Sequence, residues 1–323
     1  MGYARFAALI GPALIAIMAA AAAWGQAFPT KPLRLITPFP PGGSADIIAR
    51  LAAQGVSEVL AQPVVVENRP GAGGVTGSEY VSKQSADGYT LVLITGAYPV
   101  YPAMLKSMPF DPLKDIAMVS MLTSYPFVIS VVPDSPFKSV ADLIARAKAN
   151  PGKLNYPSSG IGTVHHLSGE LFNALAGTNI VHVPYRGGNA PLTETLAGRV
   201  DVLFEAMTLS IGQIQAGKLR ALAVTSRERW KALPDTPTVR ETLPGYEVNS
   251  FIGLGVTGGT PAAIVERLNA AVRKALETPD TRKRLVELGG EPAASSPDEM
   301  RSFIASEIEK WKKVVAARNI EKQ

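Results

Sequence analysis

One stretch of this chain joins a strand, a glycine loop and the start of a helix without interruption. Leu33–Ile36 is an apolar run typical of a buried strand, and Ile47–Leu60 carries apolar residues at helical spacing. The loop between them, Thr37–Asp46, contains Ser44, which we expect to cap the helix. A helix N-terminus has free N–H groups that bind anions. The unit therefore predicts either an ordinary strand–helix turn or an anion site.

A second unit of the same kind occurs later in the chain and favours the anion site. Lys153–Tyr156 is predicted to be a strand, Pro157–Thr163 is a glycine loop with hydroxyl side chains, and Val164–Ala176 is its helix. Two such helix ends, one from each half of the molecule, would hold one molecule between them. The pattern repeats more weakly in the strand Ile180–Val183, the turn Pro184–Gly188 and a helix through Leu196. A further strand, Asp201–Glu205, follows.

Strands alternate with helices along the chain, which predicts an α/β fold with a largely parallel sheet. In such sheets ligands bind beyond the carboxyl ends of the strands, where Thr95–Ala97 also lies. The apolar runs 127–132 and 251–256 are interpreted as two strands that cross between lobes. The expected organisation is therefore a first lobe of residues 28–127 plus 248–323 and a second lobe of residues 128–247.

Residues 1–27 are predicted to be a cleavable signal peptide. Arg5 precedes an apolar run that ends in small residues, with cleavage expected after Ala27 or Ala23. The alternative is an uncleaved anchor helix, because the apolar run is close to the length that spans a bilayer. We expect an exported protein.

The composition excludes several classes of site. The 323 residues contain no cysteine, so disulfides, thiolate metal sites and cysteine nucleophiles are absent. The formal net charge is only +5, and no dense basic run suggests nucleic acid binding. His165 and His166 are adjacent and lack the spacing of a zinc pair, so neither a metal nor another cofactor is expected. Gly253–Gly258 matches Gly-x-Gly-x-x-Gly, but its helix starts too late for a dinucleotide site.

The side chains near these loops leave alternatives open. His165 either lines a cleft or packs, and Glu205 has no partner carboxylate at a spacing that suggests acid–base chemistry. Arg186 would neutralise Glu205, contact a ligand or stay in solvent. Four tyrosines are candidates for the cleft wall or for the core, namely Tyr98, Tyr101, Tyr125 and Tyr185.

Several motifs together resemble the Bug family, the periplasmic substrate-binding receptors of tripartite tricarboxylate transporters. They are Phe39-Pro40-Pro41-Gly42-Gly43-Ser44-Ala45-Asp46, Val65-Val66-Glu67-Asn68-Arg69-Pro70-Gly71-Ala72-Gly73-Gly74, Asp87-Gly88-Tyr89-Thr90-Leu91, Pro151-Gly152-Lys153-Leu154-Asn155-Tyr156, His182-Val183-Pro184-Tyr185-Arg186-Gly187, Ala216–Thr225 and Leu233–Val239. The motifs occur in order from about Phe28 to the C-terminus.

The resemblance implies a two-lobed Venus-flytrap receptor in the periplasm with two hinge-crossing strands. It implies a ligand carboxylate held mainly by backbone N–H groups and waters, and a membrane permease as partner. We expect a monomer. The expected ligand-binding residues, from the loops and from the resemblance, are Phe39, Pro41, Gly42, Gly43, Ser44, Ala45, Thr95, Gly96, Ala97, Tyr98, Ser158, Ser159, Gly162, Thr163, His165, Tyr185, Arg186, Gly187, Gly188 and Glu205.

Two departures from the family pattern bear on the ligand. The family usually has Asp where this chain has Glu205, and it often has small polar residues around Tyr98. The ligand is therefore left open among di- and tricarboxylates, acidic amino acids and aromatic carboxylates. Two other functions stay in play: an exported sensor or scavenger of the same fold, and an exported enzyme.

Overall fold

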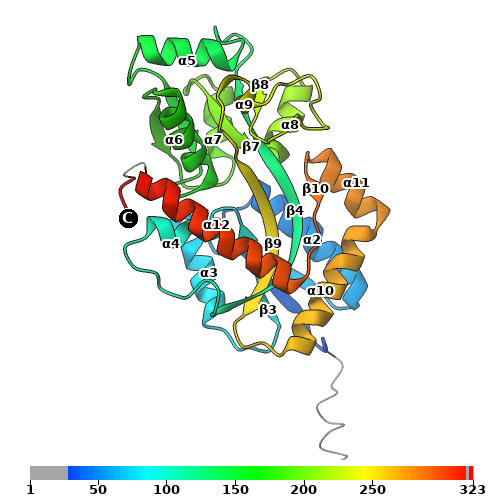
Figure 1. The fold of residues 1–323 in the computed structure, drawn as a ribbon. Helices are drawn as coiled ribbons and strands as arrows, with labels where there is room; N and C mark the ends of the chain where they lie inside the picture. Colours follow the sequence, from blue (N-terminus) through cyan, green and yellow to red (C-terminus); the bar gives the residue numbers. More distant parts are fainter. Residues whose placement is uncertain (1–27, 318–319, 323) are drawn as a thin grey trace, which may run out of the picture.

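The structure is a computed structural model that describes residues 28–317 and 320–322, so the expected signal peptide lies outside the described residues. Figure 1 shows two lobes joined by long strands. The strands are β1 (Leu33–Thr37), β2 (Val64–Asn68), β3 (Thr90–Thr95), β4 (Ile116–Val131), β5 (Asn155–Ser158), β6 (Val181–Pro184), β7 (Leu203–Ala206), β8 (Arg220–Val224), β9 (Asn249–Thr257) and β10 (Glu291–Pro292). The helices are α2 (Ser44–Leu60), η1 (Ala72–Gly74), α3 (Val75–Ser82), η2 (Tyr98–Val100), α4 (Tyr101–Met104), α5 (Val140–Ala149), α6 (Val164–Ala176), α7 (Ala190–Leu196), α8 (Met207–Gln215), α9 (Val239–Thr242), α10 (Ala262–Glu277), α11 (Pro279–Glu287) and α12 (Pro297–Ala317).

Strand β4 connects the two lobes and belongs to both of their sheets. Its first part pairs with β9 as far as Pro126, which lies opposite Asn249. From Phe127 onward it pairs with β7, and then also with β8. The change of partners therefore falls at Pro126–Phe127 on one crossing segment. On the other segment it falls at Val248–Asn249, where the Val248 amide donates to the Thr225 carbonyl. The sequence places the lobe limits at residues 127 and 248, and these limits stay a prediction.

The lower sheet in Figure 1 has the strand order β10-β4-β9-β3-β1-β2. Both of its faces are buried, because alternate residues of β1 and β3 enter different cores. Leu33, Leu35, Leu91 and Leu93 pack with α2 and α10 on one face, whereas Ile36, Val92 and Ile94 pack with α12 on the other. Two covered faces explain why these strands have continuous apolar runs.

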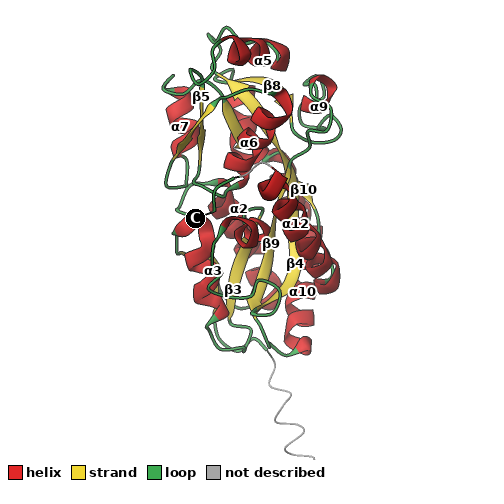
Figure 2. Cartoon of the chain, turned by 60° about the vertical axis from the view of Figure 1, so that its left-hand side comes forward, coloured by secondary structure: helices red, strands yellow, loops and turns green. Residues whose placement is uncertain are grey.

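The upper lobe is built around the second half of β4. Strands β7 and β8 pair with it, while β5 and β6 form a separate parallel pair. Figure 2 shows α5, α6 and α7 around these strands and α9 on the side of β8. The expectation of a largely parallel sheet is wrong for the central strands. β1 is parallel to β2 and β3, but β9 is antiparallel to both β3 and β4, and β7, β8 and β10 are antiparallel to β4.

The lobes touch each other on both sides of the crossing strands. Trp230 of the upper lobe donates a hydrogen bond from Nε1 to the Gly289 carbonyl at 2.9 Å, and Lys231 pairs with Glu291 at 3.0 Å. On the opposite side, Leu167 of α6 packs in one apolar cluster with Met104 and Trp311. The structure therefore has the two lobes in contact. Among the described residues, no helix is long and apolar enough to cross a membrane.

Candidate functional site

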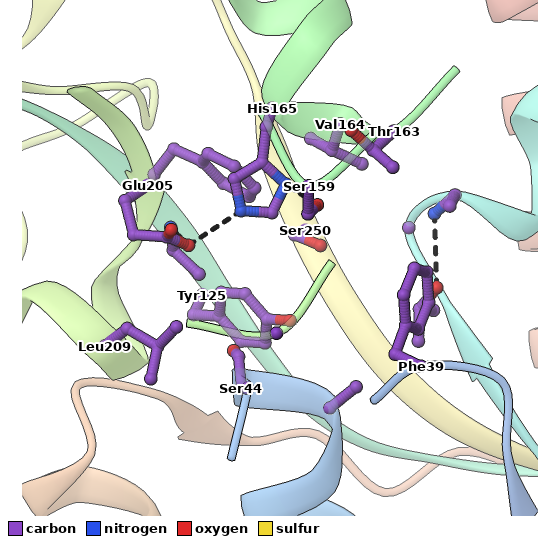
Figure 3. A pocket seen from close by; sticks show the side chains of 18 residues that line it. Phe39, Ser44, Tyr125, Ser159, Thr163, Val164, His165, Glu205, Leu209 and Ser250 are labelled. Atoms are coloured by element: carbon purple, nitrogen blue, oxygen red, sulfur yellow. Dashed lines mark hydrogen bonds and ion pairs between the residues drawn. The ribbon is translucent and has the colours of Figure 1, made fainter. Parts of the chain in front are cut away.

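A pocket of about 70 Å³ lies between the lobes, beside the crossing strands. Figure 3 shows the side chains that line it. The lower lobe contributes the start of α2 and the end of β3, and the upper lobe contributes the start of α6 and the end of β7. The lining residues are Phe39, Gly43, Ser44, Ala45, Thr95, Gly96, Ala97, Tyr125, Phe127, Ser159, Thr163, Val164, His165, Gly188, Glu205, Ala206, Leu209 and Ser250.

The first glycine loop brings the N-terminus of α2 to the pocket. The N-cap is Gly43, in an extended conformation, so the expectation that Ser44 caps the helix is wrong. Ser44 instead shares a 2.5 Å hydrogen bond with the Thr208 hydroxyl of α8, on the other lobe. The first-turn amides of α2 have no acceptor within the helix, so they are available at the pocket.

Buried Asp46 fixes the shape of this loop. Its carboxylate accepts hydrogen bonds from the Gly42 amide, from the Arg50 guanidinium and from the Asn68 side chain. Burial alone would raise the pKa of Asp46, but these hydrogen bonds outweigh it and lower the pKa below its usual value. The carboxylate therefore stays charged near the positive end of α2, which holds the loop in place.

The second glycine loop uses its own amides internally. Gly160 N donates to Ser158 Oγ at 3.1 Å, Gly162 N donates to His166 Nδ1 at 3.3 Å, and Thr163 N donates to the Gly160 carbonyl at 3.3 Å. From this loop and the start of its helix, the residues that line the pocket are Ser159, Thr163, Val164 and His165. The donors that this lobe offers are therefore the first-turn amides of α6, and the expected role of the Gly162 amide does not fit this geometry.

His165 links the second loop to the end of β7. Its Nε2 lies 2.7 Å from Glu205 Oε1, and its Nδ1 lies 2.9 Å from Ser159 Oγ. Glu205 is 1% exposed. Its Oε1 also accepts from the Ala206 amide at 2.8 Å, whereas its Oε2 is buried with no hydrogen-bond partner. Figure 3 shows the Glu205 carboxylate and the His165 ring pointing toward each other, with this hydrogen bond between them.

The other two histidines lie beneath the second loop, outside the pocket lining. The rings of His166 and His182 stack at 4.2 Å, and His182 Nε2 lies 2.5 Å from Ser158 Oγ. Burial lowers the pKa of His166 to about 4, and burial together with the neighbouring His166 lowers the pKa of His182 to about 3. Both rings are therefore neutral at ordinary pH. Among the described residues, no cluster of His, Asp and Glu has the arrangement of a metal site.

The pocket contains twelve of the residues predicted from the sequence and leaves eight outside. Tyr185, Arg186 and Gly187 line an adjacent cavity of about 470 Å³, which shares Phe39 and Ser159 with the pocket. Gly162 lines a further cavity beside Met104. Ser158 is fully buried beneath the loop, and Pro41 and Gly42 belong to the outer part of the first loop.

Tyr98 does not line the pocket, contrary to the expectation that it faces a ligand. Its side chain is 1% exposed and packs against Tyr101 and Phe110, and its hydroxyl donates to the Pro112 carbonyl at 2.8 Å. A tyrosine with a local carbonyl acceptor can be fully buried, and the sequence does not reveal that acceptor.

Six lining residues are missing from the expected ligand-binding set, although the sequence named Tyr125 as a candidate for the cleft wall: Tyr125, Phe127, Val164, Ala206, Leu209 and Ser250. Burial raises the pKa of Tyr125 to about 12, although the hydroxyls of Ser250 and Ser44 partly oppose this shift, so its phenol stays protonated. Tyr125, Phe127 and Ser250 lie on the crossing strands, so a prediction that the crossing segments form the pocket floor would have found them. None of the described residues that line the pocket is Lys or Arg.

Comparison with known proteins identifies the family. Residues 48–320 match the sequence profile described as "Tripartite tricarboxylate transporter family receptor". The chain belongs to this receptor family. BugT of Bordetella pertussis is 36% identical over 318 residues, which cover 98% of this chain and 98% of that protein. The resemblance to Bug receptors seen in the sequence is therefore confirmed.

Solved structures of related receptors share the two-lobed fold. A protein of R. palustris, solved with adipate, has 36% identity and a TM-score of 0.88, covering 92% of this chain and all of that one. MatC of Rhodopseudomonas palustris, solved with bound malate, has 31% identity and a TM-score of 0.85, covering 89% of this chain and all of that one. The tripartite tricarboxylate transporter receptors among these relatives are binding proteins, and the fold class expected from the sequence is confirmed.

Proposed function

We propose that this receptor captures a small carboxylate in the pocket between its lobes and delivers it to the membrane permease of a tripartite transporter. The observation that carries the proposal is the pairing of two helix N-termini, of α2 and α6, at one pocket that both lobes line. First-turn amides and the positive end of the helix dipole favour an anion at each. Relatives solved with adipate and malate support a carboxylate as that anion.

The proposal also includes the cellular location of the protein and its membrane partner. The protein would be exported by cleavage within residues 1–27 and would act in the periplasm as a monomer. Ligand that contacts both lobes would stabilise the form in which they touch, and the permease would accept the loaded receptor. A sensor or scavenger of the same fold would bind the ligand in the same way and differ only in its partner. Ligand-dependent association with the membrane permease of a tripartite transporter would separate the two.

A thermal-shift screen tests the proposed binding. The panel contains aliphatic di- and tricarboxylates, acidic amino acids and aromatic acids. We expect at least one acid, at about one hundred times its Kd, to stabilise the protein by about 2.7 kcal/mol, which raises the melting temperature by several degrees.

The variant Arg186→Ala should keep this shift, because Arg186 lines the adjacent cavity and not the pocket. If no acid in the panel raises the melting temperature, the proposed carboxylate binding is wrong. If Arg186→Ala alone abolishes the shift, a guanidinium and not the helix amides holds the anion.

One feature of the pocket favours a second candidate function. Ser159, His165 and Glu205 are hydrogen-bonded in the order that activates the serine of hydrolases. We nevertheless propose binding without turnover, because the relatives with this fold are receptors. After overnight incubation with the protein, mass spectrometry should find the bound acid chemically unchanged. Simple esters of that acid, incubated in the same way, should also be recovered intact. Cleavage that disappears in Ser159→Ala would instead assign hydrolysis to the pocket.

A further inference from the structure

Glu205 is the one acidic side chain among the described residues that line the pocket, and half of its carboxylate is unused. Oε1 accepts from His165 Nε2 and from the Ala206 amide. Oε2 is buried and has no partner. A buried acceptor left without a donor destabilises a protein, and more so when the acceptor is charged. A group that supplies this donor would therefore be favoured at this point.

The residues around Glu205 do not supply the missing donor. Val128 of the paired strand β4 lies opposite Glu205, and Phe127 and Leu209 form the neighbouring pocket wall. The titratable side chains that face it are His165, whose two ring nitrogens are already engaged, and Tyr125. Glu205 lines the pocket, so a ligand bound there is the group that is placed to supply this donor.

The two parts of the pocket have opposite hydrogen-bonding character. The starts of α2 and α6 present N–H groups, which suit an anion. The end of β7 presents a carboxylate oxygen, which suits a donor and repels a second anion. A ligand that satisfies both parts has a carboxylate and, at a distance from it, a group with an O–H or N–H bond.

We propose that the ligand carries, besides its carboxylate, a hydrogen-bond donor that meets Glu205 Oε2, either a hydroxyl or an ammonium group. This rests on the proposed function, since it concerns the other end of the same ligand. Glu205 thereby determines specificity, because it discriminates against acids whose second end is apolar or is another carboxylate. A site built to hydrogen-bond one substrate group rejects analogues without that group more strongly than an apolar pocket does.

Matched acids test this inference on the full mature protein. Each carbon skeleton is supplied in four versions that differ only at the end away from the carboxylate: methyl, hydroxyl, ammonium and carboxylate. Butyrate, 4-hydroxybutyrate, 4-aminobutyrate and succinate form the four-carbon set, and equivalent sets cover three-carbon, six-carbon and benzoate skeletons. Within each skeleton that binds, we expect the hydroxyl or the ammonium version to bind at least tenfold more tightly than the methyl and carboxylate versions. The comparison of hydroxyl with ammonium identifies which donor is used.

The variant Glu205→Gln reverses the polarity at this point. The amide oxygen of glutamine would keep the bonds to His165 and Ala206, and its NH₂ group would replace Oε2. We expect the donor-bearing acid to lose at least tenfold in affinity and the dicarboxylate of the same skeleton to gain. Glu58→Gln, an exposed position on α2, should leave both affinities unchanged.

Three outcomes contradict the inference in different ways. If all four versions of a skeleton bind equally, Glu205 does not select a donor although the proposed function holds. If wild-type protein prefers the dicarboxylate, the ligand end that meets Glu205 is not a donor, and the inference is wrong although the proposed function holds. If no acid binds, the proposed function fails and the inference fails with it. The wild-type series decides among these even when Glu205→Gln does not fold.

Discussion

Replacing Gly96 with valine should reduce ligand affinity by at least tenfold, and we expect closer to one hundredfold. Gly96 lies at the end of β3, in the wall of the pocket. A Cβ at this position would lie 2.6 Å from Ser250 Oγ and 2.8 Å from Val164 Cγ2, and Val164 belongs to the other lobe. The added side chain would both fill the pocket and hold the lobes apart, so its cost of roughly 1–3 kcal/mol or more falls on the ligand-bound form.

The measurement is calorimetric titration with the best acid of the thermal-shift panel, together with small-angle scattering with and without that acid. Gly212→Val on α8 is the matched control, because a Cβ there has no neighbour within 4 Å. The control should bind like the wild type. A folded Gly96→Val protein that binds the acid with unchanged affinity would show that the ligand does not occupy this pocket.

Replacing Thr225 with valine should lower the free energy of unfolding by about 2–3 kcal/mol. Thr225 is fully buried where both crossing segments meet. Its Oγ1 accepts from the Phe127 amide at 2.7 Å and lies 2.6 Å from the Val248 carbonyl, to which it donates. Valine has nearly the same shape but leaves the Phe127 amide without this acceptor and the Val248 carbonyl without this donor, each at a buried point.

The urea midpoint and the melting temperature measure this loss. Thr225→Ser keeps the hydroxyl and loses only a methyl group, so it should retain most of the stability, with a loss of about 1 kcal/mol. The prediction fails if the serine variant is as unstable as the valine variant, since the methyl packing would then account for the loss.

Local sequence signals were sufficient for the helix ends at the pocket but not for the side chains between them. The two glycine loops predict α2 and α6 because strand, turn and helix signals are contiguous. The pairing of His165 with Glu205 joins residues that are 40 positions apart, and no spacing rule indicates it. Similarly, Ser44 has the sequence of a cap but bonds to Thr208 of the other lobe, a partner that only the assembled lobes provide.

Strand β4 illustrates a different limit. Sequence analysis found only its last part, from Phe127, because Ser120 and Thr123 interrupt the apolar pattern before it. Both are fully buried and bond to backbone carbonyls of the 291–295 segment. In addition, the register with β9 shifts between Met118 and Ser120 and again between Met121 and Thr123. Such irregularities break the alternation from which a strand is predicted.

Pro126 lies at the residue where β4 changes from one sheet to the other. Proline has no amide hydrogen and a fixed φ, so it is poorly suited to the interior of a sheet and well suited to a boundary between two. Before Pro126, β4 pairs with β9 and, at Thr123 and Ser124, also with β10. After Pro126 it pairs with β7 and β8, so a bend at Pro126 disturbs the fewest strand pairs. We therefore expect the two lobes to move as rigid bodies about a hinge at this part of β4. The residues that line the pocket in either lobe can then change during evolution, and the bound ligand can change with them. The hinge between the lobes is preserved.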